Sequence, residues 1–352
     1  MPTLLEFLAL PNPDLDSLSR IKGTNTFNLA FDDIEGTRPW FDFTLDTILS
    51  CFGDILHQPL PAVEFHHPHP IQTPFLRIVD EISVDGILLR WNHVIVNRAL
   101  EIALTFLVSR GFHSILWSWG SLSLVREDRR FRPDWAGILV EPRSSEQYHK
   151  NLIPGDTKIG SKFHSRYKDS IDEFEIGEFN KVLAQAVHYS RVVGSRYGYI
   201  ISDEELLVFR RTKAVDPDGS IAASRPRRQQ KQQHQHGREP SMSSTASGVA
   251  ATWSDVVETT SGSRYTDDGN PDVNEQALDI ASIPWSRNGP QSLTVNLGLW
   301  FIHLLAALDN SLQESYMRIG GWEAIGQGRW RQAGSARVVG TLPPGALMAE
   351  NP

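Results

Sequence analysis

The feature that most constrains the fold is a pair of apolar, strand-like runs around residues 132–158. The runs DWAGILVE and NLIPGDTKIG each carry one aspartate, Asp134 and Asp156, and Lys158 follows the second aspartate by two residues. Residues i and i+2 of a strand point to the same face, so Asp156 and Lys158 are expected to project together. Two carboxylates can hold a divalent cation, and a nearby ammonium can orient water. This stretch therefore predicts the chemistry of metal-dependent phosphodiester cleavage.

Each of these residues also has an ordinary structural interpretation. An Asp-x-Lys sequence on a strand is usually a surface pair that contributes less than about 1 kcal/mol. Asp134 follows Pro133, and that dipeptide is also good turn chemistry. Pro154 lies within the second run, where proline predicts either an edge strand or a bulge.

Two amphipathic helices flank the strand-like runs. Residues 93–110 carry apolar side chains at i, i+3, i+4, i+7 and i+8, and Gly111 follows as a C-cap. A second helix is predicted at residues 178–193, where Gln185 and Tyr189 lie four apart and share a face. With strands at 113–126, 134–141, 151–160 and 197–201, the order of elements is αβββαβ. A hairpin partner, a further strand and a buried C-terminal helix complete the prediction, the helix being LTVNLGLWFIHLLAAL.

This arrangement resembles the PD-(D/E)xK nuclease superfamily and its restriction-endonuclease-like fold. Pro133-Asp134 is similar to the PD of that family, Asp156-Thr157-Lys158 to its (D/E)xK, and Gln185 with Tyr189 to the QxxxY helix motif of the RecB-type branch. The phrases RPDWAGIL, IPGDTK and SIPWSRNGPQSLTVNLGLW also resemble a family of such proteins in filamentous fungi. The resemblance covers about residues 90–310. It implies an α/β fold with an αβββαβ core and a mixed central sheet flanked by helices.

The resemblance also implies a metal site. Asp134 and Asp156 would be ligands of Mg²⁺ or Mn²⁺, and the carbonyl of Thr157 would be a third. Glu101, on the first helix, would occupy the acidic position that some relatives use to complete the metal shell. The bland alternative for Glu101 is a solvated carboxylate at the border of the apolar stripe.

Catalytic roles follow from the same resemblance. Lys158 would orient or deprotonate the attacking water, Gln185 would position the substrate or Lys158, and Tyr189 would contact the substrate backbone. The implied partner is nucleic acid, with DNA favoured over RNA. The alternative is a catalytically inactive module on the same fold that binds nucleic acid or protein. Gln185 and Tyr189 would then simply pack on the sheet.

The rest of the chain sets the context. Residues 1–89 are proline-rich, with a short helix at 43–56, and residues 311–352 predict a loosely ordered tail. Residues 214–275 are polar and low in complexity, which predicts a disordered insertion. The net charge is −8, and the basic run at 225–231 is the clearest concentration of positive charge in the sequence. His66, His67 and His69, which lie among prolines, predict a surface loop in preference to a metal cluster.

The expected compartment is intracellular, nuclear or cytoplasmic, and not secreted. One cysteine, Cys51, excludes an intramolecular disulfide framework and fits a reducing environment. The first residues have no basic region ahead of their short apolar run, which argues against a secretory signal. The longest apolar stretch, residues 293–308, is shorter than the roughly 20 residues that span a bilayer.

Overall fold

The structure is a computed structural model. It describes residues 1–18, 20, 24–25, 31, 34–60, 67–120, 132–140, 150–213 and 277–348. All of these residues fall within one compact unit formed by Met1–Ala214 and Asn274–Pro352. The predicted insertion at 214–275 lies outside the described residues, as do the basic run at 225–231 and most of the loop between the two aspartate-bearing runs.

A mixed seven-stranded sheet forms the centre of this unit, in the order β1-β7-β6-β5-β4-β3-β2. The parallel pairs are β4 with β5 and β1 with β7, and the other neighbours are antiparallel. The strands are β1 Thr37–Pro39, β2 Ile115–Trp119, β3 Trp135–Leu139, β4 Asn151–Thr157, β5 Tyr197–Ile201, β6 Glu205–Arg210 and β7 Leu278–Pro284.

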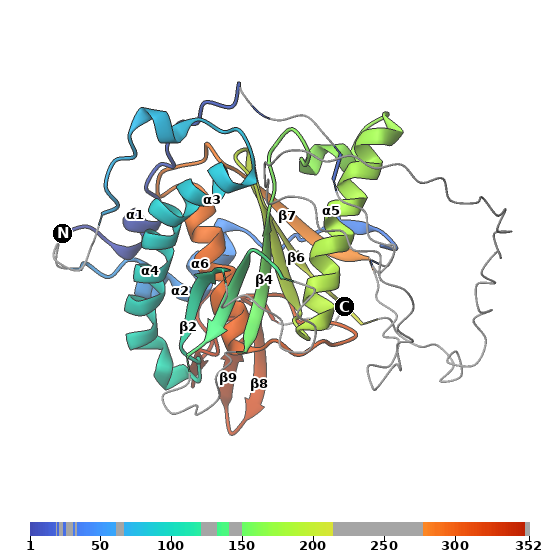
Figure 1. The fold of residues 1–352 in the computed structure, drawn as a ribbon. Coiled ribbons are helices and arrows are strands. Elements are labelled where there is room, and N and C mark those ends of the chain that lie inside the picture. The colour runs from blue at the N-terminus through green and yellow to red at the C-terminus, as the bar shows by residue number, and fades with distance from the viewer. Residues whose placement is uncertain are drawn as a thin grey trace, which may run out of the picture. The chain divides into compact units, whose positions relative to one another are not determined.

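Helices cover both faces of the sheet (Figure 1). One face is covered by α5 Glu173–Val192, and the other by α4 Asn92–Leu107 and α6 Val295–Leu308, with α1 Leu4–Leu8, α2 Leu45–Leu56 and α3 Glu81–Arg90 on the same side. Short 3₁₀ turns lie at η2 Thr73–Leu76, η3 Val108–Arg110 and η5 Ser165–Asp169. The chain order α4-β2-β3-β4-α5-β5 is the αβββαβ order that the sequence predicts.

Local sequence explains the ends of these helices. Gly111 has φ +87° and ends the helical segment 92–110 as the predicted C-cap. Helix α5 begins five residues earlier than the apolar stripe suggests, because the side chain of Asp172 accepts the Phe174 N–H and caps it there. Helix α6 is buried on nearly all sides, since it packs between the sheet and α4. The predicted buried C-terminal helix is therefore confirmed.

The segments on either side of residues 90–310 both contain regular secondary structure. Residues 37–39 of the proline-rich N-terminal segment form strand β1, which pairs with β7, and α1 and α2 contribute to the main apolar core. The predicted loose tail contains a three-stranded antiparallel sheet of β8 Trp322–Gly326, β9 Arg329–Gln332 and β10 Val338–Val339. β8 and β9 lie at the bottom of Figure 1. Both segments gain their structure from pairing partners, which local patterns do not reveal.

Pro154 lies in an interior strand, not at an edge. β4 pairs with β3 on one side and with β5 on the other, and the pairing with β5 begins only at Gly155. The register of β3 against β4 shifts between Gly137 and Ile138. A proline in a strand predicts either an edge position or a bulge. The structure shows the second, as a register shift between β3 and β4.

His303 gives the fold a predicted sensitivity to acid. Its side chain is fully buried on α6, where Nδ1 lies 2.7 Å from the Leu299 carbonyl, and burial lowers its pKa to about 4. The unfolded chain takes up this proton near pH 6.5, so stability is lost as pH falls from 6.5 towards 4. We expect the free energy of unfolding to be lower by about 2 kcal/mol at pH 5 than at pH 7 on account of this group. Urea titrations at both pH values measure the difference.

His303→Leu is expected to remove that loss, because leucine has no proton to take up. His69→Gln is the matched control, since His69 is exposed and its replacement should leave the acid sensitivity unchanged. An equal acid sensitivity in wild type and His303→Leu would contradict the assignment.

Candidate functional site

The predicted motif residues meet where β4 ends. Asp134 directly precedes β3, Asp156 and Thr157 are the last residues of β4, and Lys158 follows them. Because Trp135 is the register partner of Gly155, the start of β3 lies beside the end of β4. The Thr157 N–H donates to Asp134 Oδ2 at 2.9 Å, so the aspartate that precedes β3 is tied to the second motif.

Asp156 and Lys158 project to the same face of the sheet, as the strand period predicts. Lys158 Nζ lies 2.5 Å from Asp156 Oδ2, and the two residues are 6% and 2% exposed. Ile200, the β5 register partner of Asp156, belongs to the apolar cluster under α5. The buried ion pair therefore lies on the α5 side of the sheet.

Thr157 projects to the opposite face and contacts a residue that the sequence did not single out. Its hydroxyl donates to Asp85 Oδ1 at 2.6 Å and accepts from Trp135 Nε1 at 2.8 Å. Trp119 also hydrogen bonds to Asp85. Asp85 lies on α3, so three separate elements bring Asp85, Asp134 and Asp156 to the end of one strand.

The three carboxylates disturb one another electrostatically. Burial raises the pKa of Asp134 to about 8, with a further contribution from the Asp156 carboxylate. Burial raises the pKa of Asp85 to about 6, against the hydrogen bond from Thr157. For Lys158, burial works to lower the pKa, but the charges of Asp156 and Glu81 outweigh it and hold the ammonium protonated. Perturbed carboxyl groups of this kind cluster at functional sites.

Helix α5 contributes the pair that the QxxxY pattern predicts. Gln185 Nε2 donates to the Tyr189 hydroxyl at 2.8 Å, one helical turn away. Burial raises the pKa of the Tyr189 hydroxyl, and the charge of Asp156 adds to this effect, which places Tyr189 within electrostatic range of the motif. The hydrogen bond between them agrees with the prediction that the two residues share one face of the helix.

Glu101 does not lie with Asp134 and Asp156, which corrects the predicted metal shell. Its side chain is 69% exposed and is ion-paired with Arg98 at 2.7 Å on α4. The solvated interpretation of Glu101 is the one observed. The acidic helix residues near the site are Glu81 and Asp85 of α3, which lie four apart and therefore on one face.

The sequence contained one usable signal for α3. Asp80 accepts the Ser83 N–H in a capping box, and D-x-x-S followed by apolar residues marks a helix start. The segment is short and contains Gly86, so its apolar periodicity is weak. The tertiary packing of α3 against α4 and β4 stabilises it.

An aromatic layer supports the site from the α4 and α6 side. The Tyr199 ring passes so close to Gly155 that a Cβ on Gly155 would lie 2.1 Å from a ring carbon. Trp117 Nε1 donates to the Tyr199 hydroxyl at 2.6 Å, and the Trp117 and Trp135 rings are 4.6 Å apart. Gly155, immediately before Asp156, is therefore required by a close approach of side chain to backbone.

The donor set is suited to a hard cation but is not arranged around one in this conformation. Among the described residues, no group of three or more His, Cys, Asp or Glu side chains is placed to hold a metal ion. Asp156 Oδ2 instead pairs with the Lys158 ammonium and, within the described part of the chain, accepts no other hydrogen bond. The fit to a metal therefore rests on the chemistry of the carboxylates of Asp85, Asp134 and Asp156 near the end of β4, and requires Lys158 to give up its ion pair.

Of two cavities lined by described residues, the larger is not at the aspartates. It has a volume of about 840 Å³ and is lined by residues of the β5–β6 turn, by His164 and by the N-terminal segment. The smaller, of about 450 Å³, is lined by His67 and His69 among prolines, while His66 lies outside the described residues.

The raised pKa of Asp134 predicts that this residue lowers the stability of the fold at neutral pH. Its raised pKa means that the folded protein binds a proton that the unfolded chain releases, so stability is lost as pH rises from about 4 through 8. In metal-free buffer at pH 7, Asp134→Asn is expected to raise the free energy of unfolding by on the order of 1 kcal/mol. Denaturant unfolding followed by circular dichroism measures this change.

Asp169→Asn provides the matched control, because Asp169 is exposed and the same substitution there should change stability by less than about 0.5 kcal/mol. A decrease in stability on Asp134→Asn at pH 7 would show that the hydrogen bond to Thr157 outweighs the cost of binding this proton.

Comparison with protein-family models, with curated proteins and with solved structures finds no match for this chain. Within the described residues, no helix combines the length and apolar character needed to cross a bilayer.

Proposed function

We propose that this protein is a metal-dependent phosphodiesterase of the PD-(D/E)xK nuclease type that acts on DNA. The observation that carries the proposal is the meeting of Asp134, Asp156 and Lys158 at the end of β4, within the element order α4-β2-β3-β4-α5-β5. That order and those positions are the ones on which the resemblance to this superfamily rests. The restriction-endonuclease-like assignment of the sheet is part of the same proposal.

The carboxylates supply the metal ligands. Asp134 and Asp156 would hold the cation through oxygen, and Asp85 would take the place of Glu101 as the acidic residue contributed by a helix. Oxygen ligands and a partly hydrated shell suit Mg²⁺ or Mn²⁺. When bound, the cation supplies charge for the phosphoryl oxygens and lowers the pKa of a coordinated water. The carbonyl of Thr157 remains the further ligand that the resemblance implies.

Lys158 would supply positive charge near the phosphate, which the carboxylates cannot do. Lys158, when its ammonium is not held by Asp156, would orient the attacking water and stabilise negative charge on the phosphate. The water oxygen then forms a bond to phosphorus, the bond from phosphorus to the leaving sugar oxygen breaks, and the proton of the water passes through solvent to that oxygen. Gln185 and Tyr189 on α5 position the strand backbone.

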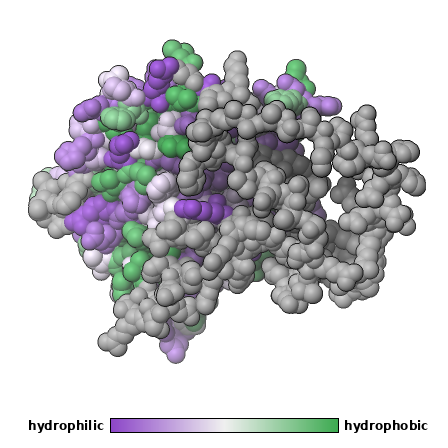
Figure 2. Space-filling model, viewed as in Figure 1, coloured by the Kyte–Doolittle hydropathy of each residue, from purple (hydrophilic) through white to green (hydrophobic). Residues whose placement is uncertain are grey.

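A catalytically inactive binding module is the second candidate, and one specific observation favours it. The Lys158–Asp156 ion pair is buried, so the charge of Asp156 is already balanced without a metal. The net charge of −8 also gives no broad positive surface for nucleic acid. In the face shown in Figure 2, hydrophilic and hydrophobic residues are interspersed over the described part of the chain.

Plasmid nicking tests the catalytic proposal. Supercoiled DNA incubated with the protein and Mg²⁺ or Mn²⁺ is expected to be nicked, and Asp156→Ala or Lys158→Ala should reduce the rate by at least about 100-fold. Glu101→Gln is the matched control and should retain the wild-type rate, because its carboxylate is solvated. Nicking that persists in both alanine variants would exclude this site as its source.

Calorimetry with Mn²⁺ separates the two candidates. The catalytic proposal expects saturable heat that is lost in Asp134→Ala and weakened about tenfold or more in Asp85→Asn. Glu101→Gln should bind Mn²⁺ as the wild type does. Absence of saturable heat in the wild type, with the fold intact by circular dichroism, would support the inactive module.

A further inference from the structure

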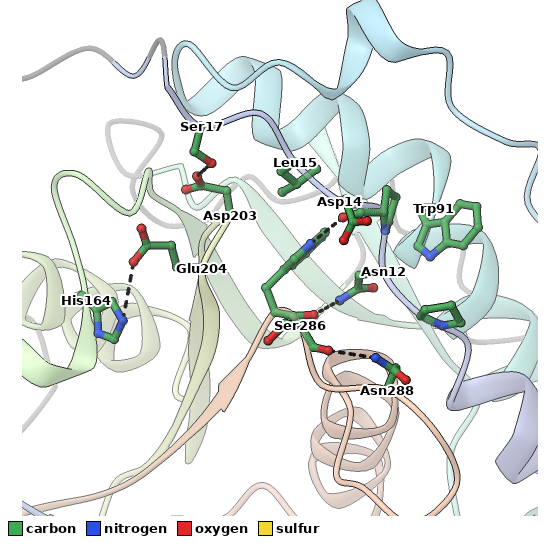
Figure 3. A pocket seen from close by; sticks show the side chains of 13 residues that line it. Asn12, Asp14, Leu15, Ser17, Trp91, His164, Asp203, Glu204, Ser286 and Asn288 are labelled. Carbon is green, nitrogen blue, oxygen red and sulfur yellow. Dashed lines mark hydrogen bonds and ion pairs between the residues drawn. The ribbon is translucent and has the colours of Figure 1, made fainter.

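A separate cavity lies at the end of the sheet where β5 ends and the turn to β6 begins. It has a volume of about 840 Å³, within the range of roughly 300–1,000 Å³ that ligand sites occupy. We call it the edge cavity. Figure 3 shows Asp203, Glu204 and His164 on one side and Asp14 and Trp91 on the other. The complete lining is Pro11, Asn12, Pro13, Asp14, Leu15, Ser17, Trp91, His164, Asp203, Glu204, Trp285, Ser286 and Asn288.

Hydrogen bonds hold the N-terminal wall of the edge cavity in place. Asn12 Nδ2 donates to the Trp285 carbonyl at 3.0 Å, and Trp285 Nε1 donates to the Pro13 carbonyl at 3.0 Å. Ser17 Oγ donates to Asp203 Oδ2 at 2.9 Å. These contacts join the N-terminal segment to the ends of β5 and β7, so the cavity is pre-formed and does not depend on a ligand for its shape.

The charge of the lining is negative. Three carboxylates line it, those of Asp14, Asp203 and Glu204, and none of its lining residues is a lysine or an arginine. Arg20 pairs with Asp203 and Glu204 at 2.5 Å each and offsets part of this charge. Asp14, on the opposite wall, is exposed and has no ion-pair partner among the described residues. Anionic ligands such as a DNA phosphate are therefore disfavoured.

Two indole rings complete the chemistry of the cavity. Trp91 lies at the junction of α3 and α4, and its Nε1 is buried without a hydrogen-bond partner in the described structure. Trp285 follows β7. Aromatic faces beside carboxylates attract guanidinium and ammonium groups through cation–π and Coulomb interactions. Arg20 shows that the β5–β6 turn already binds a guanidinium with two carboxylates.

We propose that the edge cavity binds a basic segment of a partner protein, with an arginine or lysine side chain seated between Asp14 and Glu204. Charge complementarity identifies the class of partner, and the open volume exceeds what one side chain fills, which favours a peptide over a single small cation. The inference does not rest on the proposed phosphodiesterase, because it involves neither the three clustered aspartates nor Lys158.

Fluorescence anisotropy with a fluorescein-labelled peptide of alternating glycine and arginine tests the proposal on the full-length protein. Saturable binding that weakens with added salt is expected. Asp14→Lys should weaken it about tenfold or more, because one charge is reversed at the rim. Asp16→Lys is the matched control: it makes the same change on an exposed residue of the same segment outside the lining, and should alter affinity less than about twofold.

Trp91→Phe serves as a second variant. It replaces the indole with a phenyl ring, which attracts cations more weakly, and it should reduce affinity about two- to fivefold. The proposal is overturned by equal losses in Asp14→Lys and Asp16→Lys, which would indicate non-specific attraction, or by no saturable binding at low salt. Binding of spermine or of deoxynucleotides in preference to the peptide would also overturn it. Loss of plasmid nicking in Lys158→Ala has no bearing on these outcomes.

Discussion

The pairing of β4 with β3 on one side and with β5 on the other is the constraint on which the candidate site depends. Asp134 reaches the second motif only because the start of β3 lies beside the end of β4, where its carboxylate accepts the Thr157 N–H. The parallel pairing with β5 brings α5 over the same strand end and places Tyr189 near Asp156. Small disturbances of this strand would move every group at once.

Burial then sets the chemistry of the groups that the sheet assembles. An isolated buried charge is costly, and a buried ion pair contributes little stability of its own. The Lys158–Asp156 pair offsets its desolvation, while Asp134, with a pKa of about 8, is largely protonated at neutral pH. Binding this proton costs folding free energy at neutral pH, because the unfolded chain releases it near pH 4. The edge cavity is also lined by carboxylates, but its rim is open. Their negative charge is therefore available to a partner.

Local spacing predicted two of the side-chain pairs at the candidate site and missed the helix-borne carboxylate for a physical reason. The strand period put Asp156 and Lys158 on one face, and helical spacing joined Gln185 to Tyr189, because both are local geometric rules. Glu101 was chosen from the helix with the clearest apolar stripe, yet its side chain is solvated. Asp85 lies on a short helix with a glycine in its middle, whose stability comes from packing that no local pattern records.

The sequence by itself determined the order of elements, the ends of α4 and the paired side chains two or four residues apart. These depend on interactions between near neighbours in the chain. Only the tertiary structure decided that residues 37–39 pair with β7, that residues 322–339 form their own sheet, and that α3 contributes the helix-borne acidic residue. Those outcomes depend on which distant surfaces meet, because hydrogen bonds across strands and the burial of charge are fixed by spatial neighbours and not by sequence spacing.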